Sequence, residues 1–211
     1  MKKSIYFVIL FFLAIGVSVR AQIGIKAGIN MANEIKSLSS EAIAAGFSTE
    51  NLTGYEVGLV AQLNSKKSGL GAEIGFLLSQ KGFSYSDSVS VVDMVKRGYK
   101  ELNYIEVPLN LRYCLKLGFV GVYGYGGLYV GYALNGKLVD ETEAVSQDID
   151  FGEMLNRSDY GYNLGLGVEF FKKIQFGANW SQGLKKSVFQ INQNADPRSN
   201  RVYSVTLTYL F

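Results

Sequence analysis

The stretch Tyr203-Ser-Val-Thr-Leu-Thr-Tyr-Leu-Phe211 decides the fold. Its apolar positions recur at every second residue, and hydroxyl side chains fill most of the positions between them. A period of two residues predicts a β-strand with one apolar face. We expect this strand to stay paired up to its final aromatic residue, as the closing strand of a transmembrane barrel must. Its lipid-facing set would be Tyr203, Val205, Leu207, Tyr209 and Phe211.

Seven further stretches show the same alternation, so the sequence predicts eight strands. The seven run over about 23–31, 54–63, 70–83, 102–113, 119–134, 160–170 and 174–183. Short links alternate strictly with long polar links, which cover about 32–53, 84–101, 135–159 and 184–200. Bacterial outer-membrane barrels have an even number of strands and alternate short periplasmic turns with long extracellular loops. We therefore predict an all-β fold, an eight-stranded antiparallel transmembrane β-barrel with an up-and-down meander of the OmpA or OmpX kind.

Aromatic residues favour an outward apolar face. They flank an aliphatic band at both ends, as the two membrane interfaces select. The predicted aromatic girdle consists of Tyr55, Tyr113, Tyr132, Tyr160, Tyr162, Phe170 and Trp180. The alternative is a soluble barrel such as a lipocalin, in which these side chains would point inward. The rhythm of the links and the terminal Phe211 favour the membrane barrel.

The opposite faces of the strands would line the lumen, and they carry charge. The predicted lumenal charge network consists of Lys26, Glu56, Glu73, Glu106, Arg112 and Glu169. An eight-stranded barrel is just wide enough for side chains to fill, and buried charges are costly unless they are paired. We expect Lys26 and Arg112 to bridge several of the Glu residues. A protonated Glu, entering water, or Lys81 near the outer rim would relieve the excess negative charge. A structural plug is favoured, and a narrow path for ions or solutes is the alternative.

Pro108 is unusual in the middle of a predicted strand. It cannot donate a ladder hydrogen bond, and a closed barrel has no edge strand on which to place it. We expect a β-bulge to accommodate it.

The start of the sequence predicts a secretory signal peptide over 1–21, followed by the barrel domain over 22–211. Two lysines precede an apolar run from Ile5 to Val19, and a small residue suits cleavage between Ala21 and Gln22. A membrane anchor is the alternative, but the run is shorter than the ~20 residues of a spanning helix.

Composition argues against several classes of function. The chain has 21 basic and 18 acidic residues, and three of the basic ones lie within 1–21, so the exported chain would carry 18 of each. No basic patch with interleaved aromatics is present, so nucleic acid is not an expected partner. Histidine is absent, which removes the commonest general base and the commonest metal ligand. We expect no catalytic residues, no cofactor and no metal. Asp148 and Asp150 form a formal carboxylate pair that is better interpreted as solvated loop charge.

Cys114 is the only cysteine, so the chain can form no intramolecular disulfide. We interpret it as a small apolar residue near a turn.

Several motifs together resemble the PorT-like outer-membrane β-barrel domain family, known chiefly from the Bacteroidota. The motifs are Gly24-Ile-Lys-Ala-Gly-Ile-Asn30, Gly54-Tyr-Glu-Val-Gly58, Glu73 through Gln80-Lys-Gly82, Leu102-Asn-Tyr-Ile-Glu-Val-Pro-Leu109, Gly121 to Tyr132 and Tyr160 to Phe170. The fourth is the most specific. The resemblance implies an eight-stranded barrel and a Pro at position 108, but it does not imply one function, because the family includes a secretion-system accessory and members called porin-like. The last strand also resembles the C-terminal signal read by the outer-membrane insertion machinery.

We therefore expect a protein of the cell outer membrane whose specific work lies in its long loops. The first hypothesis is a structural or interaction scaffold, or an accessory subunit of an envelope complex. A narrow porin-like channel is the alternative, and an enzyme is the least favoured class. The expected partners are outer-membrane lipids, the insertion machinery during assembly, and other envelope proteins.

Overall fold

The computed structural model describes residues 19–36, 47–65, 68–89, 94–140, 145–149, 157–185, 187–191 and 194–211. Its strands are β1 (Val19–Lys36), β2 (Phe47–Ser65), β3 (Leu70–Val89), β4 (Met94–Leu117), β5 (Val120–Asp140), β6 (Val145–Asp148), β7 (Ser158–Phe170), β8 (Ile174–Gly183), β9 (Ser187–Ile191) and β10 (Asn194–Leu210). In this part of the chain no helix is long and apolar enough to cross a membrane. Most of the predicted signal peptide, residues 1–18, lies outside the described residues.

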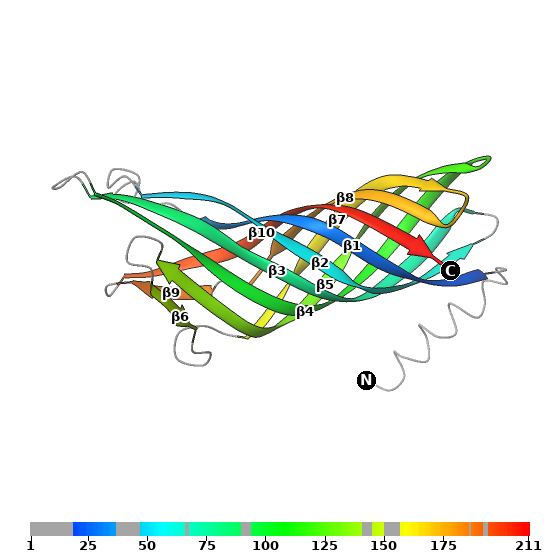
Figure 1. The fold of residues 1–211 in the computed structure, drawn as a ribbon. Coiled ribbons are helices and arrows are strands. Elements are labelled where there is room, and N and C mark those ends of the chain that lie inside the picture. The colour runs from blue at the N-terminus through cyan, green and yellow to red at the C-terminus, as the bar shows by residue number, and fades with distance from the viewer. Residues whose placement is uncertain are drawn as a thin grey trace, which may run out of the picture.

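Eight of these strands close into an antiparallel barrel, which confirms the predicted fold. Neighbours follow the order β1-β2-β3-β4-β5-β7-β8-β10, and β10 pairs back with β1 from Gly24 opposite Leu210 to Lys36 opposite Arg198. The short strands add to the ring at its rim, because β6 pairs with β5 and β9 pairs with β10. Figure 1 shows the tilted strands winding around one axis, with the C-terminus beside β1.

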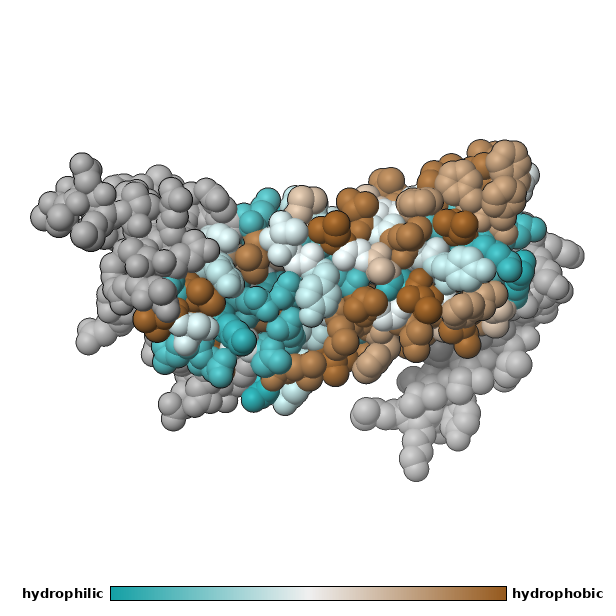
Figure 2. Space-filling view, viewed as in Figure 1, coloured by the Kyte–Doolittle hydropathy of each residue, from teal (hydrophilic) through white to brown (hydrophobic). Residues whose placement is uncertain are grey.

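Neighbouring residues on each strand point to opposite sides of the barrel wall. On β4, Leu111 is 72 % exposed, whereas the adjacent Arg112 is 3 % exposed. Apolar side chains gather over the half of the barrel that ends in the short turns, and polar ones over the other half (Figure 2). An apolar surface this continuous marks contact with another apolar phase. The faces are therefore oriented as in a membrane barrel, and not inverted as in a soluble one.

The strands are longer than predicted, and the predicted long links are largely strand. β4 spans 24 residues, more than twice the ~9–11 residues that cross a membrane. β3 and β4 together occupy most of 84–101, and β6 and β9 lie within 135–159 and 184–200. Outside a membrane a strand does not need an apolar outer face, so these segments lack the alternation that identifies the rest. We call this end of the barrel the extended end, and the opposite end the turn end.

The interior changes character along the barrel axis. Polar side chains fill it within the apolar band, whereas an apolar cluster lies on the inner side of β4 and β5 at the extended end. That cluster contains Leu102 and Tyr104 of β4, Ala133 of β5 and Ile149, with Leu138 packed against them. In water, burying these side chains is favourable. The extended end therefore buries apolar side chains on its inner side, as a soluble barrel does.

Pro108 is accommodated without the expected bulge between β3 and β4. Ile74 pairs with Leu109 and Leu77 with Glu106, so the register is unchanged across the proline, although the two pairs between them are missing from the ladder. Gly75 lies opposite, where a Cβ would come within 3.0 Å of the proline Cγ. The missing side chain of Gly75 therefore provides the space for the ring. The register shift of β4 against β5 lies further along, at Asn103 and Tyr104.

Two neighbouring turns at the turn end are held together by stacked aromatic rings. Phe119 follows Gly118, which has a φ of 74°, and its ring lies 5.7 Å from that of Phe171. Phe171 and Lys172 have φ values of 52° and 59°. Positive φ is uncommon for residues other than glycine. The backbone N–H of Phe171 donates to the carbonyl of Phe119 at 2.8 Å, which fixes the second turn against the first.

Candidate functional site

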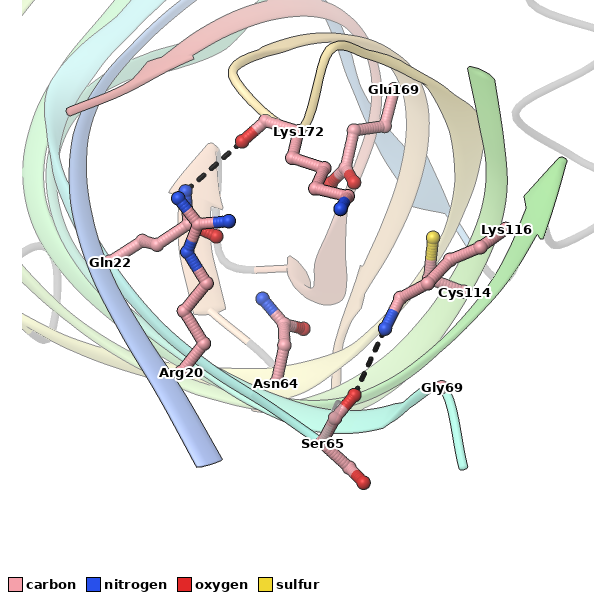
Figure 3. Close-up of a pocket in the computed structure, with 9 residues that line it drawn as sticks. All are labelled: Arg20, Gln22, Asn64, Ser65, Gly69, Cys114, Lys116, Glu169 and Lys172. Atoms are coloured by element: carbon pink, nitrogen blue, oxygen red, sulfur yellow. Dashed lines mark hydrogen bonds between the residues drawn. The ribbon is translucent and has the colours of Figure 1, made fainter. Parts of the chain in front are cut away.

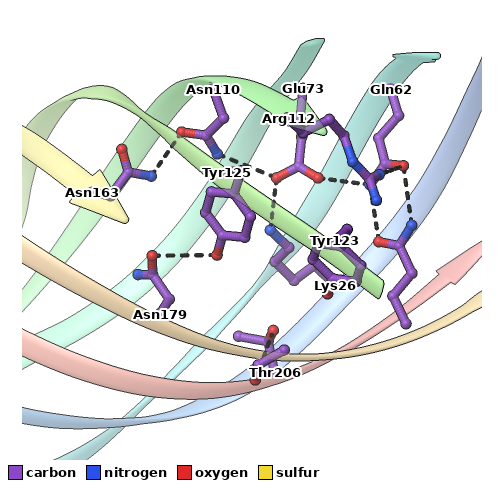
Figure 4. Close-up of polar contacts among 12 residues, drawn as sticks. Lys26, Gln62, Glu73, Asn110, Arg112, Tyr123, Tyr125, Asn163, Asn179 and Thr206 are labelled. Atoms are coloured by element: carbon purple, nitrogen blue, oxygen red, sulfur yellow. Dashed lines mark hydrogen bonds and ion pairs between the residues drawn. The ribbon is translucent and has the colours of Figure 1, made fainter. Parts of the chain in front are cut away.

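The centre of the lumen is built around Glu73. Lys26 Nζ lies 2.9 Å from Glu73 Oε1, and both side chains are buried. Gln62 donates to the same carboxylate at 2.6 Å, and Asn110 donates at 3.4 Å (Figure 4). These groups come from β1, β2, β3 and β4, so one buried carboxylate joins four neighbouring strands. The pairing and the amide hydrogen bonds offset the cost of burying the charge.

Arg112 forms a second group on the turn side of the first. Its Nη2 lies 3.6 Å from Glu169 Oε2, its Nη1 donates to Gln62 Oε1, and its guanidinium carbon lies 4.6 Å above the Tyr123 ring. Gln175 donates to Glu169 at 2.7 Å. Among the described residues each of the two predicted bases forms an ion pair with one Glu, so together they pair with two of the four predicted acids. Gln and Asn side chains supply the remaining contacts.

Lys81 was expected near the outer rim. It lies inside the barrel and belongs to the charge network. It is 2 % exposed and pairs with Glu106 and with Asp159, the latter at 3.5 Å. Its ammonium also lies 4.5 Å above the Tyr129 ring. Tyr129 and Asn200 both donate to the Asp159 carboxylate at 3.2 Å. Sequence reasoning missed Asp159, because it lies at the edge of a predicted long link.

Glu56 is buried but forms none of the ion pairs found among the described residues. It lines a small polar cavity of about 30 Å³ with Lys26, Glu106 and Tyr125. This volume is close to the share of one water molecule in the liquid. Buried Lys100 adds a further base near the extended end. With Lys81, Lys100 and Asp159 included, the lumen holds five acidic and four basic groups, so the predicted excess of negative charge falls from two to one.

Tyrosines of β5 occupy much of the remaining cross-section, which sequence reasoning did not anticipate. Tyr123 and Tyr125 are inward neighbours whose rings lie 6.3 Å apart, and Tyr125 donates to Asn179 at 3.2 Å. Glycines of β7 face both rings. A Cβ on Gly165 would lie 2.5 Å from Tyr125 Oη, and one on Gly167 would lie 2.5 Å from Tyr123 Oη. The signal in the sequence is the alternation of Tyr with Gly on one face of β5.

A larger cavity opens at the turn end of the barrel. It has a volume of about 300 Å³, and most of the side chains that line it point into it (Figure 3). Three of them are basic, Arg20, Lys116 and Lys172, and one is acidic, Glu169. Cys114 is 6 % exposed and also borders this cavity. We call this cavity the vestibule.

The predicted lipid-facing residues lie on the outer surface. On β10, Tyr203, Val205, Leu207 and Tyr209 are exposed, as is Phe211, but their role as an insertion signal stays a prediction. Of the predicted girdle, Tyr55, Tyr113, Tyr132 and Tyr160 are exposed, and Tyr162, Phe170 and Trp180 are half-buried. The last three are partly covered by other aromatic rings: Tyr162 and Trp180 pack edge to face at 5.5 Å, and Phe170 packs on Phe176 at 6.3 Å.

The expectation of no metal or catalytic group stays a prediction. Among the described residues, no group of three or more His, Cys, Asp or Glu side chains could hold a metal ion. Asp148 is exposed on β6, and Asp150 lies outside the described residues.

Comparison with solved structures places the architecture among outer-membrane barrels. OprG from Pseudomonas aeruginosa is 12 % identical with a TM-score of 0.50, and the match covers 92 % of this chain and 94 % of OprG. Ail of Yersinia pestis is 15 % identical with a TM-score of 0.46, covering 91 % of this chain and 99 % of Ail. Identities this low bear on the fold alone. A search of the curated proteins found no match.

Comparison with family models is decisive for membership. The model described as "Outer membrane protein beta-barrel domain" matches residues 16–188, well over half of the chain. Its match extends over most of the strands of the closed barrel described above. The chain therefore belongs to the outer membrane protein beta-barrel domain family.

Proposed function

We propose that this protein is a non-conducting scaffold of the outer membrane that presents its extended end to other envelope components. In this proposal residues 1–21 are removed on export, the turn end faces the periplasm, and the extended end faces outward. We also assign the chain to the PorT-like group of the family. The support for this assignment is the stretch Asn103-Tyr-Ile-Glu-Val-Pro108, which places Glu106 beside Lys81 and Pro108 opposite Gly75.

The observation that carries the proposal is the filled lumen. Three successive groups of side chains occupy it: Arg112 with Glu169, Lys26 with Glu73, and Lys81 with Glu106 and Asp159. The apolar cluster around Leu102 lies beyond them. An ion would have to separate these paired charges to pass, which is unfavourable.

The extended end offers a rigid polar surface for a partner. Asn33 donates to Asn51 at 3.1 Å, and Asn103 donates to Asn135 at 2.8 Å, so amide pairs join neighbouring strands on its exposed side. Loops and extensions on a rigid scaffold commonly carry binding function. No catalysis is assigned to the protein in this proposal.

Planar-bilayer recording tests the closed lumen. The wild-type protein is expected to give no single-channel steps. A general porin reconstituted in the same way is the positive control, because it shows that the assay detects an open barrel. Regular steps from the wild-type protein would favour the narrow channel instead.

Shortening one hairpin tests the scaffold. Ser84 pairs with Tyr99 across β3 and β4, so residues 85–98 can be replaced by an Asn-Gly turn without a change of register. The shortened barrel is expected to insert normally and to lose partners that co-purify from native outer membrane after mild crosslinking. Recovery of the wild-type protein without any partner in every preparation would contradict the interaction role.

A further inference from the structure

The vestibule adjoins the lumenal network through Glu169. This residue lines the cavity and is held by Arg112 and Gln175 of the network. The cavity's volume of about 300 Å³ is at the lower end of the range for small-molecule sites. The proposed scaffold function does not use this cavity.

The lining of the vestibule carries more positive than negative charge. Lys116 and Lys172 bring ammonium groups to its edge, and Glu169 is the one acid among its lining residues. That carboxylate is already engaged, by Arg112 Nη2 at 3.6 Å and by Gln175 Nε2 at 2.7 Å. A third cation, Arg20, belongs to the predicted signal peptide. Cleavage would remove Arg20, so the inference rests on the two lysines.

The surrounding structure holds the ammonium of Lys116 and the backbone of Lys172 at the vestibule. Lys116 Nζ, on β4, donates to the carbonyl of Ser65 at the end of β2 at 3.0 Å, two strands away along the barrel wall. The carbonyl of Lys172 accepts a hydrogen bond from Gln22 Nε2 at 3.0 Å. Lys172 also has a φ of 59°, and the stacked Phe171 beside it holds the turn in this uncommon conformation. Uncommon backbone conformations persist where the surroundings determine them, often at binding sites.

One further group points to the chemistry of a ligand. Asn64 lines the vestibule, and its Oδ1 is buried without a hydrogen-bond partner among the described residues. A buried amide oxygen left unbonded is unfavourable, and a ligand hydroxyl or a bound water would satisfy it. Cations beside an acceptor of this kind suit a small molecule that has both an anionic group and a hydroxyl group.

We propose that the vestibule binds a small hydroxylated anion, with its phosphate or carboxylate group between Lys116 and Lys172 and a hydroxyl on Asn64. Two cations on the wall of a concave site, although exposed, raise the local concentration of anions and can both contact one anionic group. The site is open to the side of the membrane on which the short turns lie. This inference does not depend on whether the extended end binds a partner.

Titration calorimetry on the full barrel in dodecyl maltoside at low salt tests the proposal. The probe is glycerol 3-phosphate, and glycerol is the uncharged control ligand. Saturable binding is expected for the first and none for the second. Lys116→Gln and Lys172→Gln are each expected to weaken binding roughly tenfold, as loss of one charge-assisted hydrogen bond predicts. Lys173→Gln is the control, because this lysine belongs to the same turn but does not line the cavity.

Unchanged affinity in both lysine variants, or equal binding of glycerol, would overturn the proposal. Retained heat-modifiable gel mobility shows that each variant is folded. A repeat in phosphatidylcholine nanodiscs, with and without phosphatidylglycerol, whose headgroup has both a phosphate and free hydroxyls, identifies the source of the anion. Competition by phosphatidylglycerol would support the site and assign it to a lipid headgroup, whereas undisturbed binding would support it and assign it to a soluble molecule. Absence of saturable binding in every arm would refute the site.

Discussion

Arg112 is the single residue on which the polar interior depends most, because it contacts Glu169, Gln62 and the Tyr123 ring. Arg112→Ala is expected to destabilise the barrel by roughly 3–5 kcal/mol, since it leaves a buried carboxylate without its cation. Urea unfolding in lipid vesicles measures the effect. Lys137→Ala, at an exposed site of β5, is the matched control and should change little. An Arg112 variant as stable as this control would contradict the role of the network.

Gly165 tests whether the barrel needs space for Tyr125. A Cβ there would lie 2.5 Å from the tyrosine oxygen. Gly165→Ala should therefore cost about 1–3 kcal/mol, as overpacking of a filled interior does. Gly124→Ala adds the same methyl group where the nearest atom is 3.7 Å away. The two variants are compared in the same unfolding assay, and equal stabilities would show that the interior is loosely filled.

The sequence predicts on which side of the barrel wall each of these residues lies. It does not predict most of the side chains that they contact. Alternation with period two places Lys26, Glu73 and Arg112 inward. Pairing depends on register and barrel closure, which bring Gln62 within 3.1 Å of Gln175 across 113 residues of sequence. No local pattern encodes such a contact. The role of the neutral Gln and Asn side chains, which connect the charged groups, could therefore not be predicted from the sequence.

Among the strands, those in the apolar band are predictable and their extensions are not. In the band, lipid on one side and a polar interior on the other impose alternation on β7 and β8. At the extended end, the outer side of β3 and β4 faces water and carries polar side chains. These parts of the sequence therefore resemble polar links, although β4 buries Leu102 and Tyr104 on its inner side. Pro108 shows a related limit. The missing donor is visible in the sequence, but the solution, a glycine on the opposite strand, depends on register.

The terminal strand should be needed for insertion more than for the finished lumen. Phe211 is 60 % exposed, and its N–H donates to the carbonyl of Ile23 at 2.9 Å, so its side chain contributes nothing to the interior. Phe211→Ala is expected to lower the amount of barrel in the outer-membrane fraction several-fold. The protein that does insert should unfold at the wild-type urea concentration. Leu115→Ala, at another exposed apolar site on the outer surface, is the control. Normal assembly of the Phe211 variant would demote this residue to an ordinary lipid contact.

For the molecule as a whole, the central claim is a closed barrel embedded in the outer membrane through its apolar band, with a plugged interior. The most direct test combines membrane fractionation with gel mobility before and after boiling. The protein is expected in the outer-membrane fraction, extractable only with detergent. Its unboiled form should migrate as a compact species that shifts to its full apparent mass on boiling. A protein that stays soluble without detergent, with the same mobility before and after boiling, would contradict the account.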